Sequence, residues 1–156
     1  MVEELERKID NNTDDEYENR VLEEMHVQHP IFYIGLLSYS PNLTKEEFEE
    51  LKKIFFLIWE YFKLKPNILT NQFTDEFFYK IQNRNIELQL YLRDEPAQNE
   101  KLSIFTEDLQ AVRSLSLLLT VLNRLNVRPV LEQMRMLKKL LIMVDVKSFI
   151  ECFDSI

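Results

Sequence analysis

The near absence of glycine constrains the fold of this chain more than any other feature. Gly35 is the single glycine among 156 residues, whereas average usage would give roughly ten. Tight hairpins, phosphate-binding loops and nucleophile elbows use glycine for positive φ angles or for close backbone approach. The sequence therefore predicts long helices joined by polar and proline-containing loops. Because Gly35 lies in the middle of an apolar run, we expect another backbone to pack closely against it.

Apolar residues recur at helical spacing along most of the chain. The clearest pattern is a heptad seam expected over residues 44–64, which consists of Phe48, Leu51, Phe55, Ile58 and Phe62. Its start is marked by Thr44 with Glu47 three residues later, the pattern of a capping box. Other helices are expected at about 14–28, 30–39, 74–94 and 106–126. The last long helix begins at Pro129 and carries a stripe of Val130, Met134, Leu137, Leu141 and Val144. A change in the apolar side after Asp145 predicts a break there.

These patterns predict an all-α fold, an up-and-down bundle of five to seven helices that forms one domain over residues 14–156. The acidic residues 1–13 are expected to be a flexible arm, and residues 94–105 around Pro96 a loop. The helix at 106–126 has a very wide apolar arc and should be the central one. With 46% apolar residues, a chain of this length can bury a core without the help of a metal or a disulfide.

Charge is distributed unevenly along the chain. Residues 1–26 hold ten acids and three bases, a balance of −7, whereas residues 113–156 hold four acids and seven bases, a balance of +3. We therefore expect the N-terminal segment to lie near the C-terminal helices. The overall net charge of −8 disfavours nucleic acid and anionic membranes as partners. The C-terminal bases could instead receive an acidic partner segment; they are Arg113, Arg124, Arg128, Arg135, Lys138 and Lys139.

Cysteine usage and hydropathy bear on the cellular compartment. Cys152 is the only cysteine, so the chain forms no internal disulfide, and its apolar neighbours are typical of an inert buried thiol. The N-terminus lacks the apolar core of a signal sequence, and no run approaches the ~20 apolar residues of a membrane span. These features predict a cytoplasmic protein that neither crosses a membrane nor uses a cofactor.

The two histidines form the one pattern that is compatible with a metal site. Glu23 and His26 have the i, i+3 spacing of one half of a carboxylate-bridged di-iron site, but no further histidine exists for the other half. The candidate is therefore a single-metal site of Glu23, His26 and His29. Its metal stays open, because imidazole binds zinc, copper, iron and nickel. The alternative interpretation is that both histidines serve a helix end, where histidine is favourable.

Apolar residues on the charged sides of two helices are candidates for contacts with a partner. Leu57 and Leu64 lie on the charged side opposite the heptad seam, and Phe56 lies at the margin of that charged side. Met136 and Met143 lie opposite the apolar stripe of the last long helix. Isolated exposed apolar residues are common, and another helix of the same chain, such as the apolar helix before the seam, could cover them. Otherwise they would form a face for self-association or for a partner, where methionine is suited to adaptable packing.

The chain has no glycine-rich phosphate loop, no nucleophile elbow and no paired cysteines. We therefore predict a non-catalytic helical protein–protein interaction module, of a regulatory or inhibitory kind, that forms a homodimer or binds another protein. The alternative function is a small metal-dependent helical-bundle enzyme that uses Glu23, His26 and His29.

Overall fold

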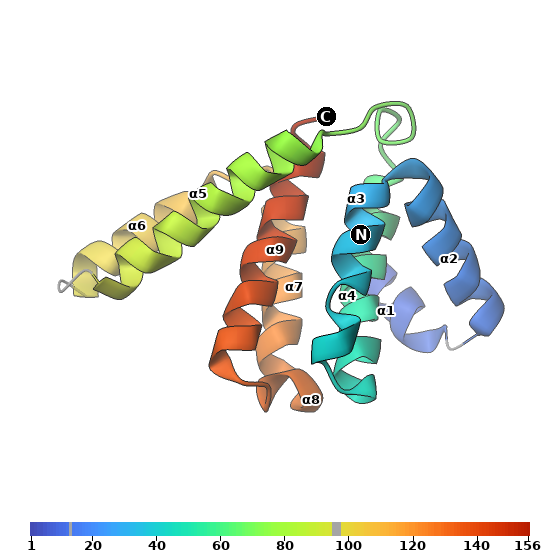
Figure 1. Cartoon of the computed structure of the whole chain (residues 1–156), viewed down its shortest axis with the longest axis horizontal. Coiled ribbons are helices and arrows are strands. Elements are labelled where there is room, and N and C mark those ends of the chain that lie inside the picture. Colours follow the sequence, from blue (N-terminus) through green and yellow to red (C-terminus); the bar gives the residue numbers. More distant parts are fainter. Residues whose placement is uncertain (13, 95–97) are drawn as a thin grey trace.

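The computed structural model describes residues 1–12, 14–94 and 98–156, and these residues fold into α-helices and one 3₁₀ helix without any strand (Figure 1). The all-α helical bundle predicted from the sequence is thereby confirmed. Within the described ranges, no helix is both long enough and apolar enough to cross a membrane. The elements in chain order are α1 (Val2–Asn11), α2 (Asp15–Gln28), α3 (Pro30–Leu37), η1 (Ser40–Asn42), α4 (Lys45–Phe62), α5 (Asp75–Asp94), α6 (Gln98–Gln110), α7 (Leu115–Val127), α8 (Pro129–Glu132) and α9 (Met136–Asp154).

Helix α4 is the centre of the bundle, and α1, α3, α7, α8 and α9 all contact it. Its first turn has the predicted capping box: the Glu47 backbone N–H donates to the Thr44 hydroxyl at 3.1 Å, and the Thr44 N–H donates to the Glu47 carboxylate at 2.9 Å. Of the heptad seam, only Phe48 is partly exposed. The prediction that 106–126 forms the central helix is wrong, because the chain turns at 111–114 and divides this stretch between α6 and α7.

The acidic N-terminal segment forms α1 and packs against α4, where the sequence predicts a flexible arm. Val2 and Ile9 are seven residues apart on one face of α1, and both are buried. The Lys8 ammonium donates to the Glu60 carboxylate of α4 at 3.0 Å. The apolar spacing from Val2 through Leu5 to Ile9 is the pattern that identifies this helix in the sequence, although its acidic composition conceals it.

Arg124 of α7 holds α1 against the bundle from the inside. Arg124 is 2% exposed, and its guanidinium donates to Glu6 at 3.0 Å and to the two oxygens of Asp10 at 2.9 and 3.1 Å. Arg128 donates to the same Asp10 carboxylate at 2.6 Å. Glu50 of α4 lies 3.6 Å from the Arg124 guanidinium. The acidic N-terminal segment therefore lies against the basic C-terminal helices, as the charge distribution predicts.

Helices α5 and α6 form a hairpin that is attached to the bundle at one end. Helix α5 packs on α9, where the Phe78 and Phe149 rings stack with centroids 4.3 Å apart. The Lys147 ammonium of α9 lies 2.7 Å from the Asn85 side-chain oxygen of α5 and 2.9 Å from the Asp108 carboxylate of α6. Beyond Asn85, none of the described side chains of α5 and α6 is buried. Figure 1 shows the hairpin running diagonally away from α9.

Two boundaries in the C-terminal half differ from those predicted. The sequence predicts a loop at 94–105, but α6 begins at Gln98, and Pro96 lies outside the described residues. The predicted break near Asp145 is wrong, because α9 runs through it and the chain turns instead at 133–135, between α8 and α9. Apolar residues occupy more than one side of α9 because α4, α5 and α7 all pack on it.

Gly35 permits a close approach, but of a side chain and not of another backbone. A Cβ atom at this position would lie 2.6 Å from the Cζ atom of Phe149. The Phe149 ring in turn contacts the rings of Phe32, Phe55 and Phe78, and protein interiors leave such a ring little room to move. The glycine therefore accommodates the tip of a buried phenylalanine, which corrects the expectation of a neighbouring backbone.

Candidate functional site

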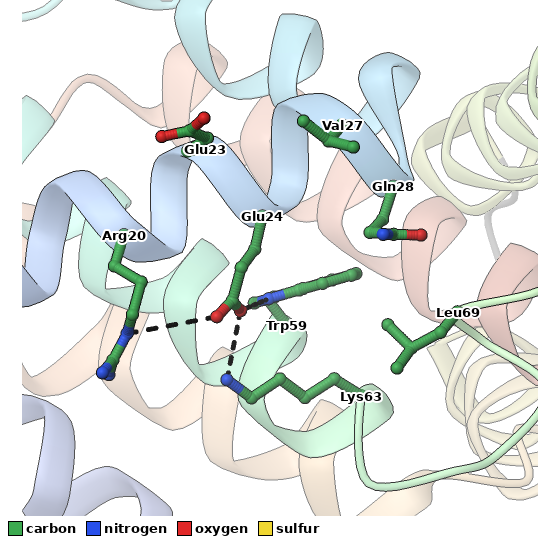
Figure 2. Close-up of a pocket in the computed structure, with 8 residues that line it drawn as sticks. All are labelled: Arg20, Glu23, Glu24, Val27, Gln28, Trp59, Lys63 and Leu69. Carbon is green, nitrogen blue, oxygen red and sulfur yellow. Dashed lines mark hydrogen bonds and ion pairs between the residues drawn. The ribbon is translucent and has the colours of Figure 1, made fainter.

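Glu23, His26 and His29 lie at the end of α2, but their side chains do not converge. His29 is buried, whereas Glu23 and His26 are exposed, and the His26 ring lies 4.7 Å from the Tyr33 ring. Figure 2 shows Glu23 directed away from the neighbouring Glu24 carboxylate. No group of three or more His, Cys, Asp or Glu side chains within 1–12, 14–94 and 98–156 is arranged to hold a metal ion. The geometry gives the metal-dependent enzyme no support.

His29 belongs to the core at the junction of α2 and α3. Its ring centroid lies 5.7 Å from that of Trp59, 5.8 Å from that of Phe73 and 5.0 Å from that of Phe153. The Nε2 atom is 2.7 Å from the carbonyl oxygen of Ile68, and since a carbonyl only accepts, we assign the hydrogen to Nε2. Burial lowers the pKa of His29 below its ordinary value of 6.5, and the hydrogen bond to Ile68 opposes this only in part. The fold therefore disfavours the charged form of this histidine.

A pH-dependent stability follows from the burial of His29. The unfolded chain takes up a proton on this imidazole near pH 6.5, whereas the folded state resists protonation. The contribution of the neutral His29 imidazole to the free energy of unfolding is therefore complete above this pH and is lost as the pH falls below it. We expect the free energy of unfolding to decrease from about pH 7 to about pH 5, and His29→Gln to remove much of this decrease.

Urea unfolding at a series of pH values measures this dependence. His26→Gln changes an exposed histidine of the same helix end and serves as the matched control, which should keep the slope of the wild type. An identical slope for His29→Gln and for the wild type would show that the buried imidazole is not its source.

A groove of about 480 Å³ lies between α2, the end of α4 and the loop that carries Leu69. Figure 2 shows Trp59 and Lys63 directed toward the Glu24 carboxylate at its centre. One carboxylate oxygen accepts from the Trp59 indole N–H at 2.9 Å and from the Lys63 ammonium at 3.1 Å. The Arg20 Nε atom lies 4.0 Å from the other oxygen. Through the donors Trp59 and Lys63, this carboxylate holds α2 on the end of α4.

The structure contradicts the prediction that Phe56 and Leu57 contact a partner. They are 5% and 1% exposed, and the Phe56 ring packs edge-on against Tyr17 of α2 at 6.3 Å. Leu57 lies on the side of α4 next to Glu60, which Lys8 of α1 reaches. The charged side of α4 is therefore covered by α1 and α2, and not by the apolar helix that precedes α4.

The other three predicted partner residues do not form the expected pairs. Leu64 is 59% exposed and lies beyond the end of α4. Met143 is partly buried and lines a small cavity beneath the α5–α6 hairpin. Met136 is 77% exposed at the start of α9, and the next residue along the chain, Leu137, is exposed as well. Of these five candidates, Met136 alone lies beside a further exposed leucine.

An exposed apolar surface, which the sequence pattern does not reveal, lies on the N-terminal half of α9. Leu137 and Leu141 are 69% and 48% exposed. They precede Val144 and Ser148 by two helical turns and so lie on the same face of α9. Further along, α5 covers that face, where the Asn85 amide donates to the Ser148 hydroxyl at 2.9 Å. The two leucines are exposed because the hairpin diverges from α9 before reaching them (Figure 1).

The α5–α6 hairpin also exposes an apolar side chain. Leu102 of α6 is 65% exposed and lies two turns before Leu109, which lines the small cavity beneath the hairpin. We define the docking notch as the exposed apolar surface that Leu137 and Leu141 form on the N-terminal half of α9. Helical periodicity assigns Leu137 and Leu141 to a core stripe, but it does not tell where the neighbouring helix departs.

Cys152 is buried in the core, as its apolar neighbours predict. Burial, with a smaller contribution from the charge of Glu151, raises the pKa of its thiol to about 12. The thiolate is the reactive form, so this side chain is a structural one.

Comparisons of the chain with protein-family models, with curated proteins and with solved structures found no match. What the protein binds must therefore be inferred from the chemistry of its own surfaces.

Proposed function

We propose that the protein is a non-catalytic protein–protein interaction module whose docking notch accepts an amphipathic, acidic helix of a partner protein. The observation that carries the proposal is the exposure of Leu137 and Leu141 on a helix face that α5 covers two turns further along. Full burial of one leucine side chain contributes about 1.5–3 kcal/mol. A single exposed leucine needs no explanation, but two on one helix face can together supply substantial binding energy.

The arrangement of the helices supports a helical occupant. Along its C-terminal half, this face of α9 already packs against a helix, α5. A partner helix at Leu137 and Leu141 would continue the same packing in the space from which the hairpin diverges. Such recognition uses apolar anchors at i, i+3 or i+4, and i+7 of the bound helix.

The charge on the N-terminal part of α9 supports an acidic occupant. Residues 133–144 contain three charged side chains, and all of them are basic: Arg135, Lys138 and Lys139. Lys138 lies 3.9 Å from Glu47, whereas Arg135 and Lys139 form no ion pair with any residue that the structure describes. Complementary charge accelerates association and selects between partners. A module of this kind acts by occupying a segment of its partner, which is a regulatory or inhibitory role.

Selection from a displayed library of amphipathic helical peptides of varied net charge tests the proposal. We expect the retained peptides to be acidic with one apolar row. Leu137→Glu/Leu141→Glu should weaken their binding by a factor of at least about 100, because two leucine contacts are lost and each is worth more than tenfold. Leu69→Glu/Val127→Glu is the matched control, because these residues are 50% and 61% exposed outside the notch.

Further variants distinguish the alternatives. Lys138→Glu/Lys139→Glu should shift the selection toward basic peptides. Equal recovery of peptides by the notch variant and the control variant, or a preference of the wild type for basic peptides, would contradict the proposal. Sedimentation shows whether the occupant is a second copy: a dimer that Leu137→Glu/Leu141→Glu dissolves would replace the partner helix by self-association.

A further inference from the structure

A cleft of about 250 Å³ lies between α3, α5 and α9, outside the docking notch. Its inner residues include Phe78 and Phe149, which are buried, and Asp145, which is partly buried. Ile34 and Tyr79 also line it and are 61% and 57% exposed, which places them toward solvent. The cleft thus combines an apolar and aromatic lining with a carboxylate at its inner end.

Among the described residues, Asp145 is held by neutral donors only. The Tyr39 hydroxyl donates to one carboxylate oxygen, and the Gln82 side-chain amide donates to the other at 2.7 Å. No lysine, arginine or histidine among the described residues forms an ion pair with Asp145. The described residues that line the cleft include one other charged residue, Asp75, so this lining carries two acids and no base.

Other enclosed carboxylates of this protein have a basic partner. Glu60 lies 3.1 Å from the Lys63 ammonium, and Glu151 lies 2.5 Å from the Lys147 ammonium. Burial raises the pKa of Asp145 above its ordinary value, and the hydrogen bonds from its two neutral donors offset this only in part. A cation beside this carboxylate would stabilise its charged form.

We infer that this cleft binds a small ligand whose primary ammonium or guanidinium group donates to Asp145 while its short apolar stem lies along Ile34 and Phe78. An ionised carboxylate offers about four acceptor positions, of which Tyr39 and Gln82 occupy two. Pockets for drug-sized ligands have volumes of about 300–1,000 Å³, and the volume of this cleft lies just below that range. The ligand is therefore a small aliphatic amine or one basic side chain.

The single glycine of the chain is a direct reporter for this binding. Gly35 lines the cleft, and its backbone amide is the only glycine amide signal in an NMR spectrum of the full chain. Titration with hexylammonium is expected to shift this signal and the Gln82 side-chain amide signals together and to saturation. Hexanol, hexanoate and tetramethylammonium should bind at least about tenfold more weakly, because each lacks the charge or the N–H donor that makes a charge-assisted hydrogen bond strong.

Variants of the carboxylate and of its neutral donors test the assignment. Asp145→Asn should weaken hexylammonium binding at least about tenfold, since it removes the charged acceptor. Tyr39→Phe keeps the carboxylate and removes one neutral donor, so it should tighten binding, and this variant decides the matter if Asp145→Asn does not fold. Equal shifts with hexanol and hexylammonium, or an unchanged affinity in both variants, would overturn the inference.

A final pair of probes separates the two sources of such a cation. Nα-acetyl-lysine amide presents the same ammonium group as a protein side chain would. Tighter binding of this probe than of hexylammonium would identify a lysine of a partner protein, and the reverse order a free aliphatic amine. Absence of any saturable shift with both probes would remove the site.

Discussion

Replacement of Arg124 by alanine is expected to destabilise the fold by about 3–5 kcal/mol, the cost of removing one partner from a buried charge pair. Glu6, Asp10 and Glu50 all lie within 3.6 Å of its guanidinium, so the change removes the base that these three carboxylates share at the junction of α1, α4 and α7. Arg128 still pairs with Asp10 and Lys53 with Glu50, but both of these bases are more exposed than Arg124. Equilibrium urea unfolding measures the loss. Hydrogen exchange should also show that the amides of α1 lose protection before those of α9, because this contact holds α1.

Arg84→Ala is the matched control for this prediction. Arg84 is also ion-paired, with Glu151, but its side chain is 54% exposed, and exposed pairs contribute only about 0–1 kcal/mol. Arg124→Met keeps an apolar stem of similar length, so the difference between Arg124→Met and Arg124→Ala isolates the packing contribution. Equal losses for Arg124→Ala and Arg84→Ala would show that burial of the charge has no special importance here.

Replacement of Phe149 by alanine is expected to destabilise the fold by about 3–5 kcal/mol, the usual cost of deleting a buried phenylalanine ring. The side chain is 1% exposed, and its ring contacts Phe32 of α3, Phe55 of α4 and Phe78 of α5. One ring thus joins four helices, including the attachment of the hairpin. Phe149→Leu should cost less because it leaves a smaller cavity. A loss below about 1 kcal/mol for Phe149→Ala would contradict this central position.

Gly35→Ala tests the packing of the Phe149 ring independently, because the sign of its effect on the free energy of unfolding depends on the contact between Gly35 and that ring. In an unconstrained helix interior, alanine is more stable than glycine by about 1 kcal/mol. Here the added Cβ would meet the Phe149 ring at 2.6 Å, and overpacking of this kind costs about 1–3 kcal/mol. We expect net destabilisation, and we expect Phe149→Leu to reduce it in the double variant because residues in contact are not additive. Stabilisation by Gly35→Ala would show that the ring can move aside.

The two candidate binding surfaces differ in how far the sequence reveals them. The bases at the start of α9 are visible in the sequence, and they already favour an acidic partner. The exposure of Leu137 and Leu141 is not visible, because these residues continue a regular apolar stripe. In the same way, helical periodicity at Asp145 predicts a break in the helix, whereas the residues that hold its carboxylate, Tyr39 and Gln82, come from distant parts of the chain.

The sequence by itself determined the all-α class, the capping box of α4, its buried heptad seam and the meeting of the acidic N-terminus with the basic C-terminal helices. These features depend on local propensity, on the 3.6-residue period and on the sign of charge, all of which are written along the chain. Tertiary structure decided which apolar residues are covered. Leu57 is buried because α1 packs over its side of α4, and Leu137 is exposed because α5 leaves α9 before reaching it. Whether a side chain is buried depends on which helices pack against it, whereas the periodicity of the sequence describes each helix separately.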